Sequence, residues 1–158
     1  MRIALFQPDI AANAGTIIRM GACMGVPIDI IEPCGFPFGD AALRRAGLDY
    51  LPKAQVTRHA SWATYLATSP ARLVLASTAG HTAYTATSYR DDDTLLLGQE
   101  TSGVPRHVSE ACGERVFIPM VDGMRSLNVA VAGGMILGEM LRQTRINVSA
   151  KGEMRNEH

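Results

Sequence analysis

Three consecutive leucines, Leu95, Leu96 and Leu97, restrict the folds that are open to this chain. A strand with one face in water alternates apolar and polar side chains, so an unbroken apolar run indicates a strand covered on both faces, as in a parallel sheet. The leucine run at residues 94–98 is one of five short apolar runs that are bounded by Gly, Pro or polar residues; the others lie at 2–6, 28–31, 73–77 and 115–118. We expect each of these runs to form a strand.

Helix signals separate the apolar runs. Asn13 can cap a helix that carries Ile17, Met20 and Met24 on one face and ends at Gly25. Further helices are expected at residues 40–47, after Ser61, at 105–113 with Pro105 in the first turn, and at about 128–142. This alternation predicts a single α/β domain with a mostly parallel sheet and helices on both faces. Residues 78–93, rich in Ser, Thr and Asp, are expected to form a solvated connection.

The composition narrows the function further. A chain of 158 residues is long enough for one core, and its formal net charge of zero gives no global field for nucleic acid. All but two of its 15 basic residues are Arg, which suits phosphates and base edges but fits a GC-rich coding sequence equally well. Three scattered cysteines without a secretory leader predict free thiols in the cytoplasm. The longest apolar stretch, 127–141, is too short to span a bilayer.

Several classes of enzyme lack their motifs in this sequence. The His and Cys residues show no metal-ligand spacing, so we expect no metal. The glycine-rich turn at residues 98–103 allows a ligand to approach the backbone, but no Lys-Ser/Thr pair follows it as in a P-loop. No GxGxxG follows the first strand, and no GxSxG elbow occurs. Metal catalysis, serine hydrolysis and nicotinamide chemistry are therefore disfavoured.

Several polar residues in three segments can have either a structural or a functional role. Glu100 is either a solvated turn acid or a functional group, Arg19 is either a solvated helix residue or a ligand contact, and the same alternatives hold for Arg125. Asn128 or Ser126 could simply cap the last helix. On that helix Ala130, Gly134 and Gly138 form a stripe with almost no side chain, which indicates close packing either within the fold or across a dimer interface.

Taken together, these segments resemble a known family. NAGTIIRMGACMG, GQETSGVP and IPMVDGMRSLNVAVA resemble motifs 1, 2 and 3 of the SPOUT RNA 2′-O-methyltransferases. IIEPCGF, LRRAGLDY and VTRH resemble most closely the small members that modify the tRNA wobble nucleotide. The resemblance covers residues 1–145, which we expect to be one SPOUT domain, and leaves residues 146–158 as a mobile tail.

The resemblance carries implications for fold and activity. It implies a C-terminal trefoil knot, S-adenosylmethionine bound in the knot and released as S-adenosylhomocysteine, and a homodimer. The implied substrate is the 2′-hydroxyl of nucleotide 34, cytidine or a modified uridine, in leucine tRNAs. A SPOUT enzyme acting on another tRNA position or on ribosomal RNA remains an alternative, and a non-catalytic RNA-binding protein with a degenerate pocket is a more distant one.

The resemblance also assigns roles to residues. Implied for catalysis are Arg19, Asn13, Glu100, Ser126 and Asn128, with Arg19 acting either as a base or as an electrostatic and positioning group. Implied for cofactor binding are Ala76, Gly98, Ile118, Met120, Ser126 and Leu127. Implied for tRNA binding are Arg44, Arg45, Arg58 and Arg125. Gly138 departs from the pattern, because a Tyr linked to RNA handling is expected there.

Overall fold

The computed structural model describes residues 1–39, 41, 51–68 and 70–149. Its strands are β1 (Arg2–Phe6), β2 (Ile28–Ile31), β3 (Val56–His59), β4 (Leu73–Ala76), β5 (Thr82–Ala83), β6 (Thr94–Leu97) and β7 (Glu114–Phe117). They form one 7-stranded sheet in the order β3-β2-β1-β6-β4-β7-β5. All of its pairings are parallel. The helices are α1 (Ala11–Met24), α3 (Trp62–Leu66), α4 (Arg106–Glu110), α5 (Val129–Ser149) and the 3-10 helix η1 (Leu51–Lys53).

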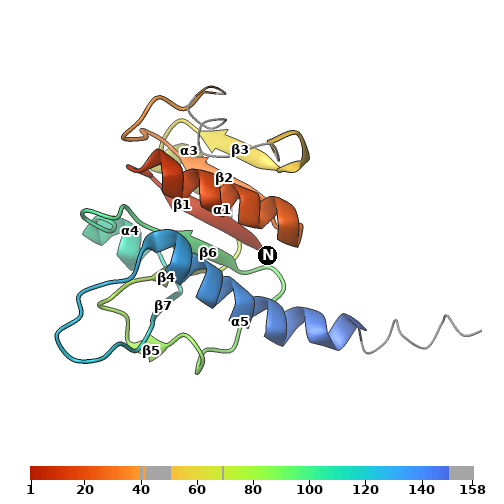
Figure 1. Ribbon diagram of the computed structural model, residues 1–158, viewed down its shortest axis with the longest axis vertical. Coiled ribbons are helices and arrows are strands. Elements are labelled where there is room, and N and C mark those ends of the chain that lie inside the picture. The colour runs from red at the N-terminus through yellow and green to blue at the C-terminus, as the bar shows by residue number, and fades with distance from the viewer. Residues whose placement is uncertain (40, 42–50, 69, 150–158) are drawn as a thin grey trace, which may run out of the picture.

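The sheet lies between two layers of helix (Figure 1). Leu95 and Leu97 pack into a core shared with α1 and α5, whereas Leu96 packs into a second core shared with α3 and α4. All three leucine side chains are buried. The α/β class, the parallel sheet and its two covered faces are therefore confirmed, while the trefoil knot stays a prediction of the resemblance.

Two strands and one helix start differ from the sequence-based expectations. β3 and β5 were not predicted, because one reads VTRH with polar residues at its centre and the other has only two residues. α1 begins at Ala11 with Ile10 at the N-cap position, so Asn13 lies inside the helix rather than capping it. Gly25 does end α1, with a φ of 63° in the left-handed region. The helix expected after Ser61 is α3, and the Ser61 side chain caps it by accepting from the Thr64 N–H at 3.1 Å.

The last helix, α5, is longer than the sequence predicts. α5 continues to Ser149, beyond the predicted end at residue 142, so the expected tail begins with helical residues. The remaining residues of that tail lie outside the described part of the chain. The helix expected at residues 40–47 lies outside it as well, apart from residue 41.

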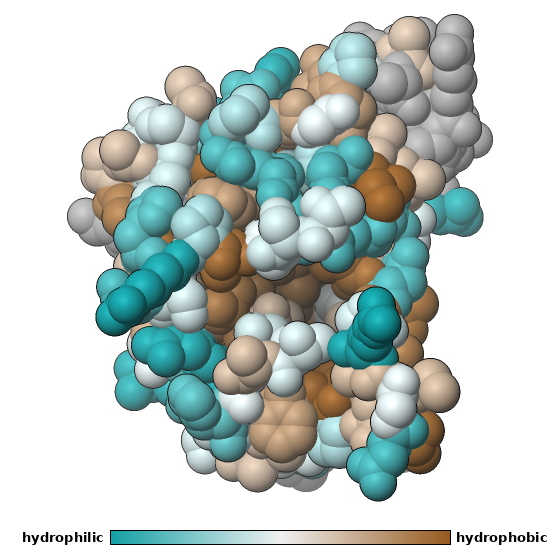
Figure 2. All heavy atoms as spheres, turned by 90° about the vertical axis from the view of Figure 1, so that its left-hand side faces the viewer, coloured by the Kyte–Doolittle hydropathy of each residue, from teal (hydrophilic) through white to brown (hydrophobic). Residues whose placement is uncertain are grey.

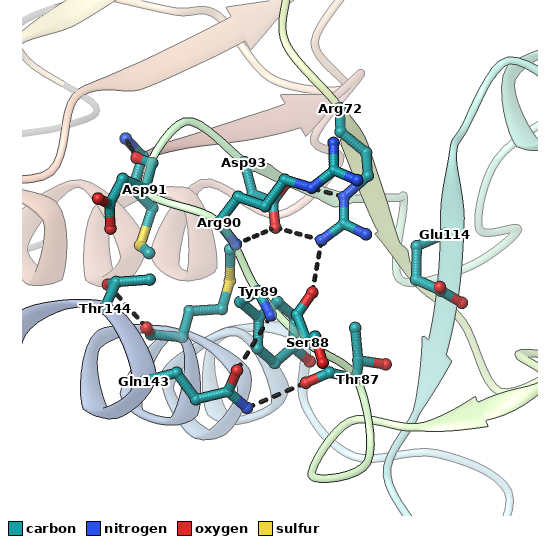
Figure 3. Close-up of polar contacts among 12 residues, drawn as sticks. Arg72, Thr87, Ser88, Tyr89, Arg90, Asp91, Asp93, Glu114, Gln143 and Thr144 are labelled. Carbon is teal, nitrogen blue, oxygen red and sulfur yellow. Dashed lines mark hydrogen bonds and ion pairs between the residues drawn. The ribbon is translucent and has the colours of Figure 1, made fainter.

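Residues 78–93 are not simply a solvated connection, as the sequence suggested. Asp93 is fully buried and accepts from Arg72 Nε at 2.8 Å and from the Arg90 N–H at 2.8 Å (Figure 3). Gln143 of α5 accepts from the Tyr89 N–H at 3.0 Å and donates to the Thr87 carbonyl at 3.0 Å. These bonds fasten the segment to the sheet and to α5, an attachment that its polar composition does not reveal.

The small-residue stripe of α5 serves two different contacts. A Cβ on Gly134 would lie 3.6 Å from Met20 Sδ, so this glycine faces α1 within the fold. A Cβ on Gly138 would meet no atom within 4 Å of the described structure. Val131 and Met135, one helical turn apart, are 52% and 39% exposed. The stripe therefore packs internally at one end and borders an exposed apolar face at the other.

None of the helices in the described ranges is long and apolar enough to cross a membrane.

Candidate active site

A cleft of about 1020 Å³ opens where β4, β6 and β7 end. Figure 2 shows this side of the molecule, with apolar side chains in a hollow and hydrophilic ones around it. In open α/β sheets, ligands bind outside the carboxyl ends of the strands, which is where this cleft lies. All six residues implied for cofactor binding line it: Ala76, Gly98, Ile118, Met120, Ser126 and Leu127. Their roles stay predictions, but the fold brings together positions up to 51 residues apart (76 to 127).

The turn at residues 98–103 forms one wall of the cleft. It is closed by a pair of backbone hydrogen bonds between Gln99 and Gly103, each 2.9 Å long. Gly103 has a φ of 65°, which favours glycine. A Cβ on Gly98 would lie 2.7 Å from the Gly103 carbonyl carbon, so the tight turn needs glycine at both ends. The glycines are therefore required by contacts within the turn, and the expected approach of a ligand to its backbone stays a prediction.

Asn13, Glu100 and Asn128 come together beside this turn. Asn13 Nδ2 donates to Glu100 Oε1, and Asn128 Nδ2 donates to Asn13 Oδ1 at 3.0 Å. Asn128 also caps α5, because its Oδ1 accepts from the N–H groups of Ala130 at 2.8 Å and Val131 at 3.2 Å. The cap and the polar contact are thus made by the same side chain. Motif positions separated by up to 115 residues form a single hydrogen-bonded chain.

One further residue belongs to this cluster that the sequence did not single out. Asp9 Oδ1 accepts from the Glu100 N–H at 3.1 Å, and Asp9 Oδ2 accepts from Thr101 Oγ1 at 2.7 Å. Burial by itself raises the pKa of Asp9, but the bonds from Thr101 and from the Glu100 backbone outweigh it and lower the pKa below its ordinary value. In the sequence, Asp9 is indistinguishable from an ordinary polar residue before a helix.

The arginines implied by the resemblance are placed differently from one another. Arg125 is exposed and lines the cleft. Arg19 is exposed on α1 but is not among the lining residues of the cleft within the described chain. Arg58 pairs with Glu32, and its guanidinium lies 4.7 Å from the centre of the Phe38 ring. Arg44 and Arg45 lie outside the described residues.

The described residues contain no group of three or more His, Cys, Asp or Glu side chains placed to hold a metal ion. Cys112 is buried, and burial raises the pKa of its thiol to about 11. Burial likewise raises the pKa of the Cys34 thiol. Neither thiol is suited to act as a nucleophile, because the thiolate is the reactive form.

Comparisons with known proteins agree with this arrangement. The model of the SpoU rRNA Methylase family matches residues 1–138. A protein of Ancylobacter novellus named tRNA (cytidine(34)-2′-O)-methyltransferase is 51% identical over 91% of this chain and 93% of its own length. A structure described as "Structural insights into the 2-OH methylation of C/U34 on tRNA" is 38% identical, with a TM-score of 0.85 over 90% of this chain and 94% of that one.

A third relative was solved with a ligand. An AdoMet-bound rRNA methyltransferase of Sinorhizobium meliloti is 27% identical, with a TM-score of 0.80 over 89% of this chain and 55% of that one. The family match covers most of the chain, and it includes the strands, the turn and the polar cluster around the cleft. The chain belongs to the SpoU rRNA methylase family.

Proposed function

We propose that this protein transfers a methyl group from S-adenosylmethionine to the ribose 2′-hydroxyl of nucleotide 34 in tRNA. The observation that carries this proposal is the cleft at residues 98–103 and 118–128, whose edge holds the linked side chains of Asn13, Glu100 and Asn128. Relatives that share up to 51% of this sequence carry the name of that activity.

The cleft fits the cofactor in size and in chemistry. Its volume of about 1020 Å³ accommodates a nucleoside-sized ligand. Gly98 lines the cleft, and Ala76, Ile118 and Leu127 offer apolar surface and main-chain groups suited to an adenine ring. Bound there, S-adenosylmethionine supplies an electrophilic methyl group on a sulfonium centre, so the transfer needs no metal.

The protein's own part in the reaction is to position the ribose and to manage charge on its oxygen. Alignment of reacting groups can supply about 7–11 kcal/mol in favourable cases. Glu100, which accepts from Asn13 with one oxygen, can accept the hydroxyl proton or its hydrogen bond with the other. Guanidinium groups donate hydrogen bonds and retain their protons in proteins, so Arg19 suits an electrostatic or phosphate-binding role better than that of a base. Ser126, at the rim of the cleft, can orient the ligand by hydrogen bonding.

The working unit we propose is a homodimer. Met24, Val131 and Met135 are exposed apolar residues on α1 and α5, and Gly138 offers open space beside them. A second copy packing on this face explains why small and apolar residues occupy it. It also gives Arg19, which does not line the cleft of its own chain among the described residues, a route to a cleft in the partner.

The nucleic-acid substrate is proposed as a leucine tRNA, in the cytoplasm, contacted by the arginines named from the resemblance. Arg125 borders the cleft and can meet a phosphate near the reacting ribose. Arg58 is already paired with Glu32, so its contribution requires exchange of that partner. Activity on another tRNA position or on ribosomal RNA is the competing assignment, since an rRNA methyltransferase shares the fold.

The deciding experiment transfers label from S-adenosylmethionine to tRNA taken from a strain that lacks this gene, and then maps the 2′-O-methylated nucleotide. Label at position 34 of leucine tRNAs is the expected result, whereas label elsewhere moves the substrate and keeps the chemistry. Arg19→Ala is expected to abolish transfer and to keep cofactor affinity within a few fold. A large loss of cofactor affinity in that variant contradicts the role given to Arg19.

A further inference from the structure

We propose that Asp9 is a positioning residue for methyl transfer, whose carboxylate fixes the tip of the 98–103 turn, and with it Glu100, against the start of α1. This inference rests on the proposed function, because the position of Glu100 matters only if Glu100 meets the substrate. Asp9 lies three residues after the end of β1, and Gln7 between them has a φ of 45°. This bend after β1 brings the half-buried Asp9 carboxylate to the edge of the cleft.

Both oxygens of the Asp9 carboxylate are engaged by the turn. One accepts from the backbone of Glu100 at 3.1 Å and the other from the hydroxyl of Thr101 at 2.7 Å. Hydrogen bonds to a carboxylate are about twice as strong as those between neutral groups, so this is a firm attachment. Because both oxygens already accept, the carboxylate is better suited to hold the turn than to remove a proton from the substrate.

The backbone beneath Asp9 is also held in place. The Gly35 N–H donates to the Pro8 carbonyl at 2.9 Å. A Cβ on Gly35 would lie 2.8 Å from the Asp9 Cα, so the loop after β2 packs closely against the Asp9 backbone. Asp9 therefore links the backbone held by Gly35 to the tip of the 98–103 turn.

The attachment affects only part of the turn. The two bonds between Gln99 and Gly103 close the turn without help from Asp9, so Gly98 keeps its place on the cofactor side. What depends on Asp9 is the tip, where the Glu100 side chain meets Asn13. Removal of the carboxylate should therefore lower the rate of transfer while leaving cofactor affinity intact, a separation that general destabilisation of the pocket does not produce.

The test compares four variants of the full chain. In Asp9→Ala we expect kcat to fall by about 10- to 100-fold and the cofactor Kd to change by less than threefold. Asp9→Asn keeps one acceptor for the Glu100 N–H and can donate to the Thr101 hydroxyl, so it should restore kcat to within about fivefold of the wild type. Thr101→Val removes one of the two bonds and should give a smaller loss of kcat. Asp92→Ala is the matched control. Asp92 is exposed and precedes the N-terminal end of β6, away from the cleft, so this variant should leave kcat unchanged.

A second readout does not depend on activity. Exchange of the Glu100 amide hydrogen should become at least about tenfold faster in Asp9→Ala, with the Leu96 amide as an unchanged internal reference. Unchanged Glu100 exchange, a kcat within twofold of the wild type, or an equal loss of cofactor affinity and kcat each overturns the proposal. If wild-type protein methylates no position 34, the proposed function fails, and hydrogen exchange still decides whether Asp9 holds the turn.

Discussion

Asn128 shows how one side chain can serve both stability and chemistry. Its carbonyl oxygen caps α5, and its amide donates to Asn13, which in turn contacts Glu100. A helix cap is a local feature that the sequence can predict, and a cap at Asn128 is one of the two alternatives that the sequence offers. The link to Asn13 could not be anticipated from pattern, because the two residues are 115 positions apart.

The two tasks of Asn128 can be separated by substitution. Asn128→Asp keeps an oxygen at the N-cap, so we expect its free energy of unfolding to stay within about 0.5 kcal/mol of the wild type. An ionised carboxylate cannot donate to Asn13, so transfer should fall by about tenfold, which corresponds to about 1.4 kcal/mol. Asn128→Ala should lose transfer and also about 1 kcal/mol of stability. Urea unfolding and labelled-methyl transfer measure the two effects, and full activity in Asn128→Asp contradicts the assignment.

Gly98 makes a sharper steric prediction at the same scale. In Gly98→Ala the new methyl group lies 2.7 Å from the backbone carbon of Gly103, which cannot move without opening the turn. We expect a loss of about 1–3 kcal/mol in unfolding free energy and a large loss of cofactor affinity. Gly39→Ala is the matched control, because its Cβ meets no atom of the described residues within 4 Å, and its stability should change by less than about 0.5 kcal/mol. Tight cofactor binding by Gly98→Ala, measured by calorimetry, contradicts the prediction that the close contact between Gly98 and Gly103 shapes the cofactor site.

At the scale of elements, the predictable features are those with local causes. Gly25 ends α1 and Ser61 caps α3 because each acts on backbone groups within a few residues of itself. Asn13 was expected to do the same, yet its amide is drawn to Glu100, 87 residues further along the chain. β5 escaped prediction because two residues carry no periodic signal and its pairing with β7 is non-local. Local chemistry thus located most elements, and distant contacts decided the exceptions.

α5 carries a charge arrangement that should make its attachment sensitive to acid. Hydrogen bonds from Arg142 and then from Gln143 lower the pKa of Glu139 to about 2. A carboxylate with a depressed folded-state pKa stabilises the fold above its unfolded value, about 4.3, and this contribution is lost as the pH falls toward 2. Gln143 bonds to the backbone of Thr87 and Tyr89, and it also donates to Glu139 Oε1 at 2.8 Å. Glu139 therefore helps to orient the side chain that attaches residues 87–89 to α5.

The expected result is a pH-dependent difference between wild type and Glu139→Gln. The difference in unfolding free energy should be largest near pH 7, shrink below about pH 5 and vanish near pH 2. Glu110→Gln is the control, because its ion pair with Arg106 on α4 joins two exposed side chains and should contribute little at any pH. Denaturant unfolding at several pH values measures both, and a constant difference for Glu139→Gln contradicts the ion-pair explanation.

At the scale of the whole molecule, the uneven placement of the motif residues has a structural meaning. Residues of motifs 2 and 3 line the cleft of one chain, and Asn13 of motif 1 bonds to two of them, whereas Arg19 lies on a different side of α1. Residues 13 and 19 are six apart, which on a helix of 3.6 residues per turn separates their side chains by about 120°. A helix whose Asn13 bonds to residues of its own cleft can therefore present Arg19 to a neighbouring chain.

The dimer proposal makes this arrangement testable. We expect Met135→Glu to give monomers in light scattering and to lower transfer by at least about 100-fold, because a charge replaces an apolar side chain at the proposed contact and Arg19 loses its partner cleft. Leu66→Glu, a similar change at an exposed residue of α3 on the opposite face of the sheet, should stay dimeric and active.

Mixing inactive Arg19→Ala with inactive Gly98→Ala should restore about a quarter of wild-type activity, since half of the chains enter mixed dimers and each of these has one intact site built from both chains. No recovery, with mixed dimers demonstrated by mass spectrometry, means that Arg19 acts within its own chain.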